Sequence, residues 1–148
     1  AADQCAIDVG GLGAGVYDRL VELVKPEECE LVQVNSAESP IDAKKYTNKR
    51  AEMWGVMRDW LRVGCIQADE ALATDLTGVE YGFTADDRLQ LERKEDMEKR
   101  GLASPDDADA LALTFAHPVH DTPPAEDRLA GARGGARRVD YDPYSLIR

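Results

Sequence analysis

Hydrophobic alternation opens the chain and then gives way to helical spacing. Cys5 and Ile7 alternate with small or acidic residues, which predicts a short, largely buried strand with Asp8 at its end. From Val16 onward, apolar residues recur at helical spacing, and "CELVQVNS" from Cys29 predicts the next strand. A strand, a crossover helix and a second strand imply a parallel pair in an α/β sheet. Asp8 would lie at the carboxyl end of its strand, where ligands of open α/β sheets bind.

Further elements follow from the same patterns. Residues 51–66 carry an apolar face that predicts a core helix, with Glu52, Arg58, Asp59 and Arg62 outside that face. "ADEALATDL" predicts a short helix, "TGVEYGFTADDRLQLE" a β-hairpin, and "RKEDMEKRG" a short charged helix ended by Gly101. In "SPDDADALALTFAHPV", Ser104 is a good N-cap and Pro105 suits the first helical position. Its apolar residues predict a last helix that is packed against the sheet.

Composition narrows the class of protein. A chain of 148 residues with three isolated cysteines fits one soluble domain in a reducing compartment, without a disulfide framework or a zinc ribbon. The net charge of −11 argues against a protein that coats nucleic acid nonspecifically. His117 and His120 lack a third ligand at zinc-site spacing.

The glycine-rich turn after Asp8 leaves alternatives open. A dinucleotide fingerprint that starts at Gly11 needs glycine where Val16 stands, and a phosphate loop needs a Gly-Lys-Ser/Thr that is absent. The glycines also suit a sharp strand-to-helix turn with no ligand.

Three acids open the last helix. Asp106 and Asp107 suit the positive end of its dipole, whereas Asp109 lies one turn beyond Asp106 on the same face. Two carboxylates at this spacing repel each other unless a cation is near. A divalent metal site is the economical explanation.

Four segments, in order, resemble the C-terminal nuclease domain of the large terminase subunit of tailed bacteriophages. They are "IDVGGLGAGVYDRL", "YTNKRAEMW", "RLQLERKEDMEKRG" and "SPDDADALALTFA", and the resemblance runs from about Cys5 to Ala116. It implies an RNase H-like fold related to Holliday-junction resolvases, here a partial one with a parallel strand pair, a crossover helix, a terminase-type hairpin and a packed C-terminal helix. It also implies metal-dependent cutting of concatemeric double-stranded DNA with two Mg²⁺ or Mn²⁺ ions.

The resemblance assigns candidate site residues. Asp8 and Asp109 match two of the family's metal-binding catalytic acids, and Asp106 stands where resolvase relatives carry a further acid. The glycine turn would let a DNA phosphate approach the metals without a side chain in the way. The predicted DNA contacts are Gly11, Gly13, Lys44, Lys45, Lys49 and Arg50.

The chain also departs from the family pattern. The family domain begins with three antiparallel strands, the first of which carries the leading catalytic aspartate, and an ATPase motor precedes it. We therefore expect a nuclease domain over 1–116 that lacks its first strands, with impaired activity, and a flexible tail with a short anchor over 117–148. The open sheet edge would favour self-association. By resemblance, the partners are double-stranded DNA, the phage portal and the small terminase subunit, in the cytoplasm of a bacterial host and without a membrane.

Two other classes of function stay open. The chain could be an interaction module that binds portal or DNA without cutting. It could instead be a Rossmann-like small-molecule enzyme, which would need a ribose-binding acid at the end of the second strand, where Asn35 and Ser36 stand.

Overall fold

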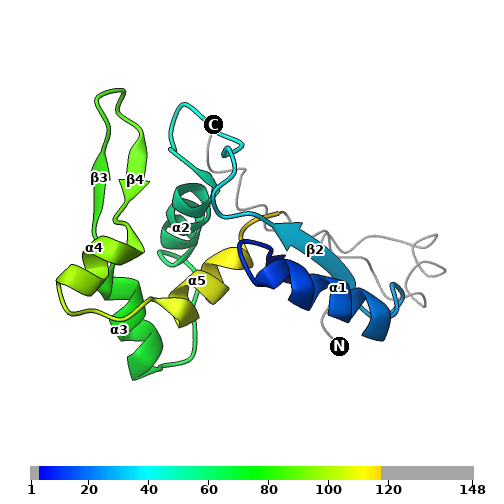
Figure 1. The fold of residues 1–148 in the computed structure, drawn as a ribbon. Coiled ribbons are helices and arrows are strands. Elements are labelled where there is room, and N and C mark those ends of the chain that lie inside the picture. Colours follow the sequence, from blue (N-terminus) through cyan, green and yellow to red (C-terminus); the bar gives the residue numbers. More distant parts are fainter. Residues whose placement is uncertain (1–3, 118–148) are drawn as a thin grey trace, which may run out of the picture.

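Residues 4–117 are described by the structure, a computed structural model. Figure 1 shows how the helices and strands are arranged. In chain order they are β1 (Gln4–Asp8), α1 (Gly13–Leu23), β2 (Glu30–Val34), α2 (Lys49–Trp60), α3 (Glu70–Gly78), β3 (Tyr81–Phe83), β4 (Leu89–Leu91), α4 (Lys94–Lys99) and α5 (Asp106–Leu113). The α/β class and each element expected from the sequence are confirmed.

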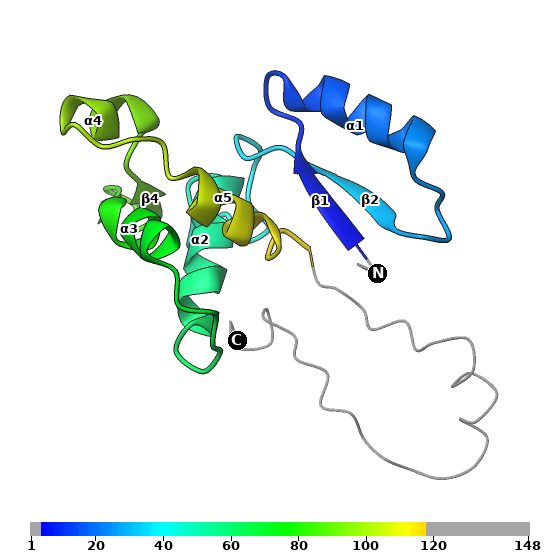
Figure 2. The same cartoon turned by 90° about the horizontal axis from the view of Figure 1, so that it is seen from below.

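β1 and β2 form the predicted parallel pair. Cys5 lies opposite Leu31 and Asp8 lies opposite Val34, and α1 makes the crossover between the two strands. Figure 2 shows α1 running along this pair, with α5 beside β1. Asp8 therefore lies at the carboxyl end of β1, as expected.

The main core forms where α2 and α5 meet the sheet. Asn48 caps α2 by accepting a hydrogen bond from the N–H of Ala51, and the helix then buries the predicted apolar face. Ala108 and Ala112 of α5 are fully buried against it, because their small side chains let the two helices approach closely. Val34 of β2 joins the same cluster, so the last helix packs against the sheet as predicted.

The start of α5 differs in detail from the sequence expectation. The helix begins at Asp106 instead of Pro105, and the hydroxyl of Ser104 donates to the Asp106 carboxylate at 2.6 Å rather than capping backbone N–H groups. The carboxylate of Asp75 on α3 accepts from the N–H groups of Asp107 and Ala108, at 3.0 and 3.4 Å. A tertiary contact therefore supplies the cap, which local sequence could not reveal.

The hairpin and α4 follow the predicted pattern. β3 and β4 are antiparallel, with Gly82 opposite Gln90, and Asp87 in the turn has a φ of 59°. Gly101 ends the charged helix with a φ of +79°, a conformation that favours glycine.

Two features of burial stand out, and the first overturns an expectation. Glu52 was expected on the outside of its helix, yet it is 1% exposed. Its carboxylate accepts from the N–H groups of Ile41 and Asp42 and from the ammonium of Lys49, so it ties the loop at 41–42 to the start of α2. The apolar residues of α1 show the opposite behaviour, since no residue of that helix is buried.

Candidate functional site

Asp8 is held at the end of β1 by two donors. Its Oδ1 accepts from the N–H of Gly10 at 2.9 Å, and its Oδ2 accepts from the hydroxyl of Ser36 at 2.7 Å. Ser36 follows β2, so the ends of both parallel strands contribute to the arrangement. The carboxylate is therefore oriented at the edge where α/β sheets bind ligands.

The glycine turn has a local structural reason. Gly11 has a φ of +61°, which side chains rarely permit, and a Cβ on Gly13 would lie 1.7 Å from the backbone oxygen of Asp8. The turn can thus fold back over the end of β1 only with glycine at these positions. The role of Gly11 and Gly13 in admitting a DNA phosphate stays a prediction.

Asp109, on α5, accepts hydrogen bonds from three side chains. Arg50 of α2 donates from Nε at 2.9 Å and from Nη2 at 3.4 Å, and the indole N–H of Trp54 donates at 2.8 Å. The ammonium of Lys94 lies 3.0 Å from the other oxygen. Burial alone would raise the pKa of Asp109, but Arg50, Lys94 and Trp54 together hold it below its usual value, so the side chain is a carboxylate.

Hydrogen bonds through Ser36 and Arg50 link Asp8 to Asp109. The hydroxyl of Ser36 donates to Asp8, and the backbone oxygen of Ser36 accepts from the N–H of Arg50 at 3.0 Å. The Arg50 guanidinium then donates to Asp109 and also to the backbone oxygen of Glu92 at 3.2 Å. Asp8 and Asp109 are 101 positions apart in the sequence, and each is held by one member of the bonded pair Ser36 and Arg50.

Asp106 has a different environment. Its side chain is 81% exposed, and Lys94 lies 3.7 Å from it, between Asp106 and Asp109. The cation that the paired acids require is thus supplied by a lysine. Across residues 4–117, no group of three or more His, Cys, Asp or Glu side chains is placed to hold a metal ion. The metal role of Asp106 with Asp8 and Asp109 stays a prediction.

The four basic residues among the predicted DNA contacts divide into two pairs. Lys44 is exposed, and the ammonium of Lys45 lies 5.3 Å from the centre of the Tyr46 ring. The side chain of Lys49 is buried, with its ammonium 2.8 Å from the Glu52 carboxylate, and the guanidinium of Arg50 is bound to Asp109. Lys49 therefore stabilises the fold and has no exposed ammonium for a phosphate, which leaves Lys44 and Lys45 as the accessible part of the predicted DNA contact.

Sequence reasoning missed the residues that hold Asp109. Arg50 and Trp54 are four positions apart on α2, with the guanidinium 5.6 Å from the indole ring, and this spacing was a usable signal. Lys94 reaches the site from α4, and no local pattern identifies it.

Similarity searches connect this geometry to known structures. No protein-family model matches the chain, and no curated protein matches it. Among solved structures, the nuclease domain of the large terminase subunit gp2 of bacterial virus Sf6 is similar, with a TM-score of 0.65 and 25% identity. A lysine-to-alanine mutant of that domain solved with manganese has a TM-score of 0.66 and 24% identity, and one solved with calcium has 0.65 and 24%.

The similarity is extensive but partial. It covers 78% of this chain and 65 to 66% of each Sf6 domain, so the chain spans just under two thirds of those domains. By its fold, this chain is similar to the nuclease domain of a phage large terminase subunit, and the RNase H-like architecture expected from its sequence motifs is confirmed.

Proposed function

We propose that this chain is the endonuclease part of a phage DNA-packaging terminase and hydrolyses phosphodiester bonds of concatemeric double-stranded DNA. The observation that carries the proposal is the hydrogen-bond chain from Asp8 through Ser36 and Arg50 to Asp109. It orients two carboxylates from separate elements, and these are the same two acids that the family motifs select. The similarity to nuclease domains solved with manganese and calcium supports it.

The donor chemistry suits a divalent cation. Mg²⁺ and Mn²⁺ prefer carboxylate oxygens, and Asp8 and Asp109 supply them. When bound, such ions lower the pKa of the attacking water and stabilise the leaving oxygen. Because the described residues hold no group of three ligands, we propose that Asp8 and Asp109 form part of the set, with Asp106 as a peripheral acid, and that this chain binds metal weakly and cuts DNA slowly.

The chain's own residues would orient and hold these ligands. Arg50 and Trp54 fix the rotamer of Asp109, while Lys94, at 45% exposure, is the more movable of its two cations. Ser36 holds Asp8 from the end of β2. Preorganisation of this kind keeps carboxylates in place without the cost of ordering them when a ligand arrives.

Metal binding and nicking together test the proposal. Manganese titration of the full chain, followed by electron paramagnetic resonance, should give weak binding that Asp8→Asn and Asp109→Asn each reduce at least about tenfold. Supercoiled plasmid should be nicked slowly with Mn²⁺ or Mg²⁺ and not with EDTA. Asn keeps one acceptor oxygen, for Trp54 and Arg50 at position 109 and for Gly10 or Ser36 at position 8, so both variants should stay folded by circular dichroism.

Asp86→Asn, on the hairpin turn with a 79% exposed side chain, is the matched control for the lost charge. It should leave both readouts unchanged. Full nicking by Asp8→Asn or Asp109→Asn would overturn the assignment of the site.

A non-cutting interaction fragment is the second candidate function, and the incomplete ligand set favours it. It predicts DNA binding without metal-dependent nicking. In either case, we propose that Lys44 and Lys45 contact the DNA backbone, so their joint replacement by Ala should weaken DNA binding and reduce its salt dependence. Lys25→Ala, which removes an exposed charge after α1, is the control.

Further partners follow from the terminase proposal. We propose the portal and the small terminase subunit as partners, in the cytoplasm of a bacterial host, and self-association through the sheet edge and the exposed face of α1. No helix within the described ranges is long and apolar enough to cross a membrane. A Rossmann-like enzyme gains no support, because β2 ends at Val34 and the hydroxyl of Ser36 that follows is bound to Asp8.

A further inference from the structure

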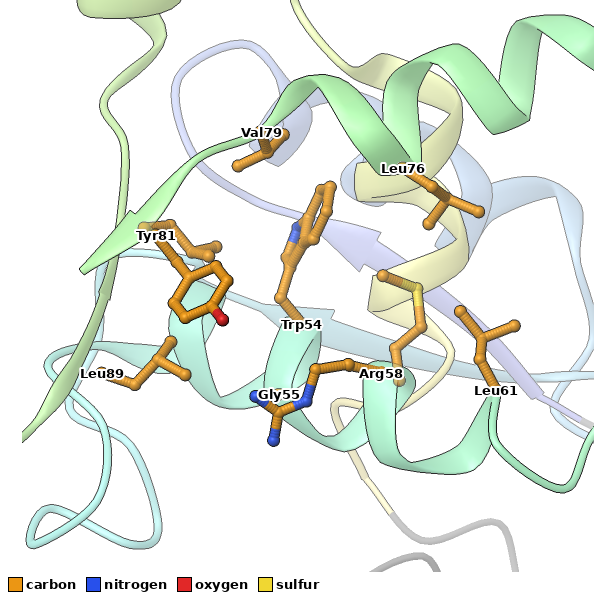
Figure 3. Close-up of a pocket in the computed structure, with 10 residues that line it drawn as sticks. Trp54, Gly55, Arg58, Leu61, Leu76, Val79, Tyr81 and Leu89 are labelled. Atoms are coloured by element: carbon orange, nitrogen blue, oxygen red, sulfur yellow. The ribbon is translucent and has the colours of Figure 1, made fainter. Parts of the chain in front are cut away.

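An apolar groove lies between α2, α3 and the β3–β4 hairpin. It encloses about 280 Å³. Figure 3 shows Leu61 and Leu76 at one side of it and Tyr81 and Leu89 at the other, with Trp54 between them. A concave surface of this size and chemistry is typical of a site that receives apolar side chains.

The groove is open and has one charged edge. Tyr81 exposes 62% of its surface, although it lines the groove. Arg58 also lines it, and its guanidinium donates to Asp59 through Nε and Nη2. Since a guanidinium carries five N–H donors, Arg58 can bind a second carboxylate. An occupant should therefore be apolar and carry an acid close to its apolar residues.

The chain itself passes close to the groove before its last 31 residues, 118–148. The ring of Phe115 lies 5.5 Å from the ring of Trp60, and Trp60 precedes Leu61, which lines the groove. The stretch between 117 and 141 can span up to about 80 Å at roughly 3.4 Å per residue. A folded unit of this size has a radius of gyration of only about 13 Å, so every face of it is within reach.

The end of the sequence has the composition that the groove requires. Between 118 and 138, the large aliphatic residues are Val119 and Leu129, and four arginines are present. Residues 139–148 read "VDYDPYSLIR", in which apolar and aromatic residues alternate with two acids. Asp142 stands two positions before Tyr144 and four before Leu146, so one short segment supplies both an anchor and a partner for Arg58.

We propose that residues 139–148 dock in the groove of their own chain, with Tyr144 and Leu146 among the apolar side chains and Asp142 at Arg58. The inference goes beyond the nuclease proposal and does not depend on it. Attachment to the same chain raises the effective concentration of the segment to the order of mM, so modest affinity is enough for occupancy. Docking would cover Tyr81 and tie the hairpin to α2.

Hydrogen–deuterium exchange of the full chain tests this contact. The double variant Tyr144→Ser with Leu146→Ser should speed amide exchange about threefold or more in α3 and the hairpin and leave β1 and β2 unchanged. A synthetic peptide of residues 139–148 added to that variant should restore the slower exchange. Leu129→Ser is the matched control in the same part of the sequence, and it should change nothing.

A photocrosslinker identifies the place of contact. Benzoylphenylalanine in place of Tyr144 should crosslink to peptides that contain residues 54–61 or 76–81, and Arg58→Glu should reduce the yield several-fold. Unchanged exchange in the double variant, or crosslinks confined to other regions, would overturn the proposal. So would protection and crosslinking that appear only as protein concentration rises, because the occupant would then be a second copy.

Discussion

Helices α1 and α2 have the same kind of apolar spacing and opposite degrees of burial. On α2, Met53 and Met57 are each 1% exposed, within the core that α5 and β2 complete. On α1, Val16 is 54% exposed and Leu23 is 61% exposed, and the helix packs on the strands of the parallel pair. Apolar periodicity therefore predicts a helix reliably, whereas burial depends on which elements the rest of the fold brings to its face.

The same contrast holds for the ion pairs of the two helices. Arg19 and Glu22 on α1, and Lys49 and Glu52 on α2, are each a base followed by an acid three positions later. The α1 pair lies in solvent, whereas the α2 pair is buried and also binds two loop N–H groups. The same spacing of base and acid thus gives a solvent-exposed ion pair on α1 and a buried pair that anchors a loop on α2.

Removal of the acid from each ion pair should give the largest difference in stability between the two helices. Glu52→Ala should lower the free energy of unfolding by about 3–5 kcal/mol, because Lys49 would be left buried without its partner and the N–H groups of Ile41 and Asp42 would lose their acceptor. Glu22→Ala should change it by less than about 1 kcal/mol, since exposed pairs contribute little. Urea unfolding followed by circular dichroism measures both, and equal losses would contradict the contrast.

A methyl group added to each helix should change the stability of the protein in opposite directions. A Cβ on Gly55 would lie 2.4 Å from the buried Tyr46 ring, so Gly55→Ala should destabilise the protein by about 1–3 kcal/mol through overpacking. A Cβ on Gly15 meets nothing within 4 Å, and Gly15→Ala should stabilise α1 by about 0.5–1 kcal/mol. Thermal unfolding decides the signs, and stabilisation by Gly55→Ala would show that the contact with Tyr46 is loose.

The parts of the fold that could be predicted from sequence are those with a local cause. The alternation around Ile7 predicts β1, the apolar face that starts at residue 51 predicts α2, and Gly101 ends α4. These signals act through neighbouring backbone, so a single segment contains them. The start of α5 moved by one residue, because Asp75 supplies the cap from another helix, whereas α2 was expected to reach residue 66 and ends at Trp60.

The parts that could not be predicted depend on distant residues. Glu52 looks like a solvent-facing acid in its helix, and only the loop at 41–42 makes it a buried acceptor. In the candidate site, the motifs selected Asp8 and Asp109, but Lys94 comes from an element that the pattern does not connect to them. The ammonium of Lys94 lies between Asp106 and Asp109, and the metal role of these two acids stays a prediction.

The exposed face of α1 should also govern association between chains. Leu12, the N-cap of α1, is 93% exposed, and with Val16 it forms an exposed apolar surface at the start of the helix. The apolar residues Met53, Val56 and Met57 of α2 are instead buried. Replacement of both residues by Lys should raise the concentration at which the protein associates by about tenfold, which corresponds to ~1.4 kcal/mol. Analytical ultracentrifugation measures this, with Arg19→Ala as the control on the same helix. An unchanged association constant would place the contact elsewhere.

The smallest effect should come from a hydroxyl in the α2 region. Tyr46 is fully buried against Gly55, and its hydroxyl has no hydrogen-bond partner among the residues that the structure describes. Burial of an unpaired hydroxyl costs free energy, so Tyr46→Phe should leave the fold intact and stabilise it by up to about 1 kcal/mol. Tyr46→Leu, which removes the ring but stays apolar, should destabilise it instead, because packing against α2 depends on the ring's volume. Thermal unfolding of both variants measures the difference in stability. A loss of stability in Tyr46→Phe would mean that the hydroxyl forms a hydrogen bond. The tight packing around α2 would then include a polar contact.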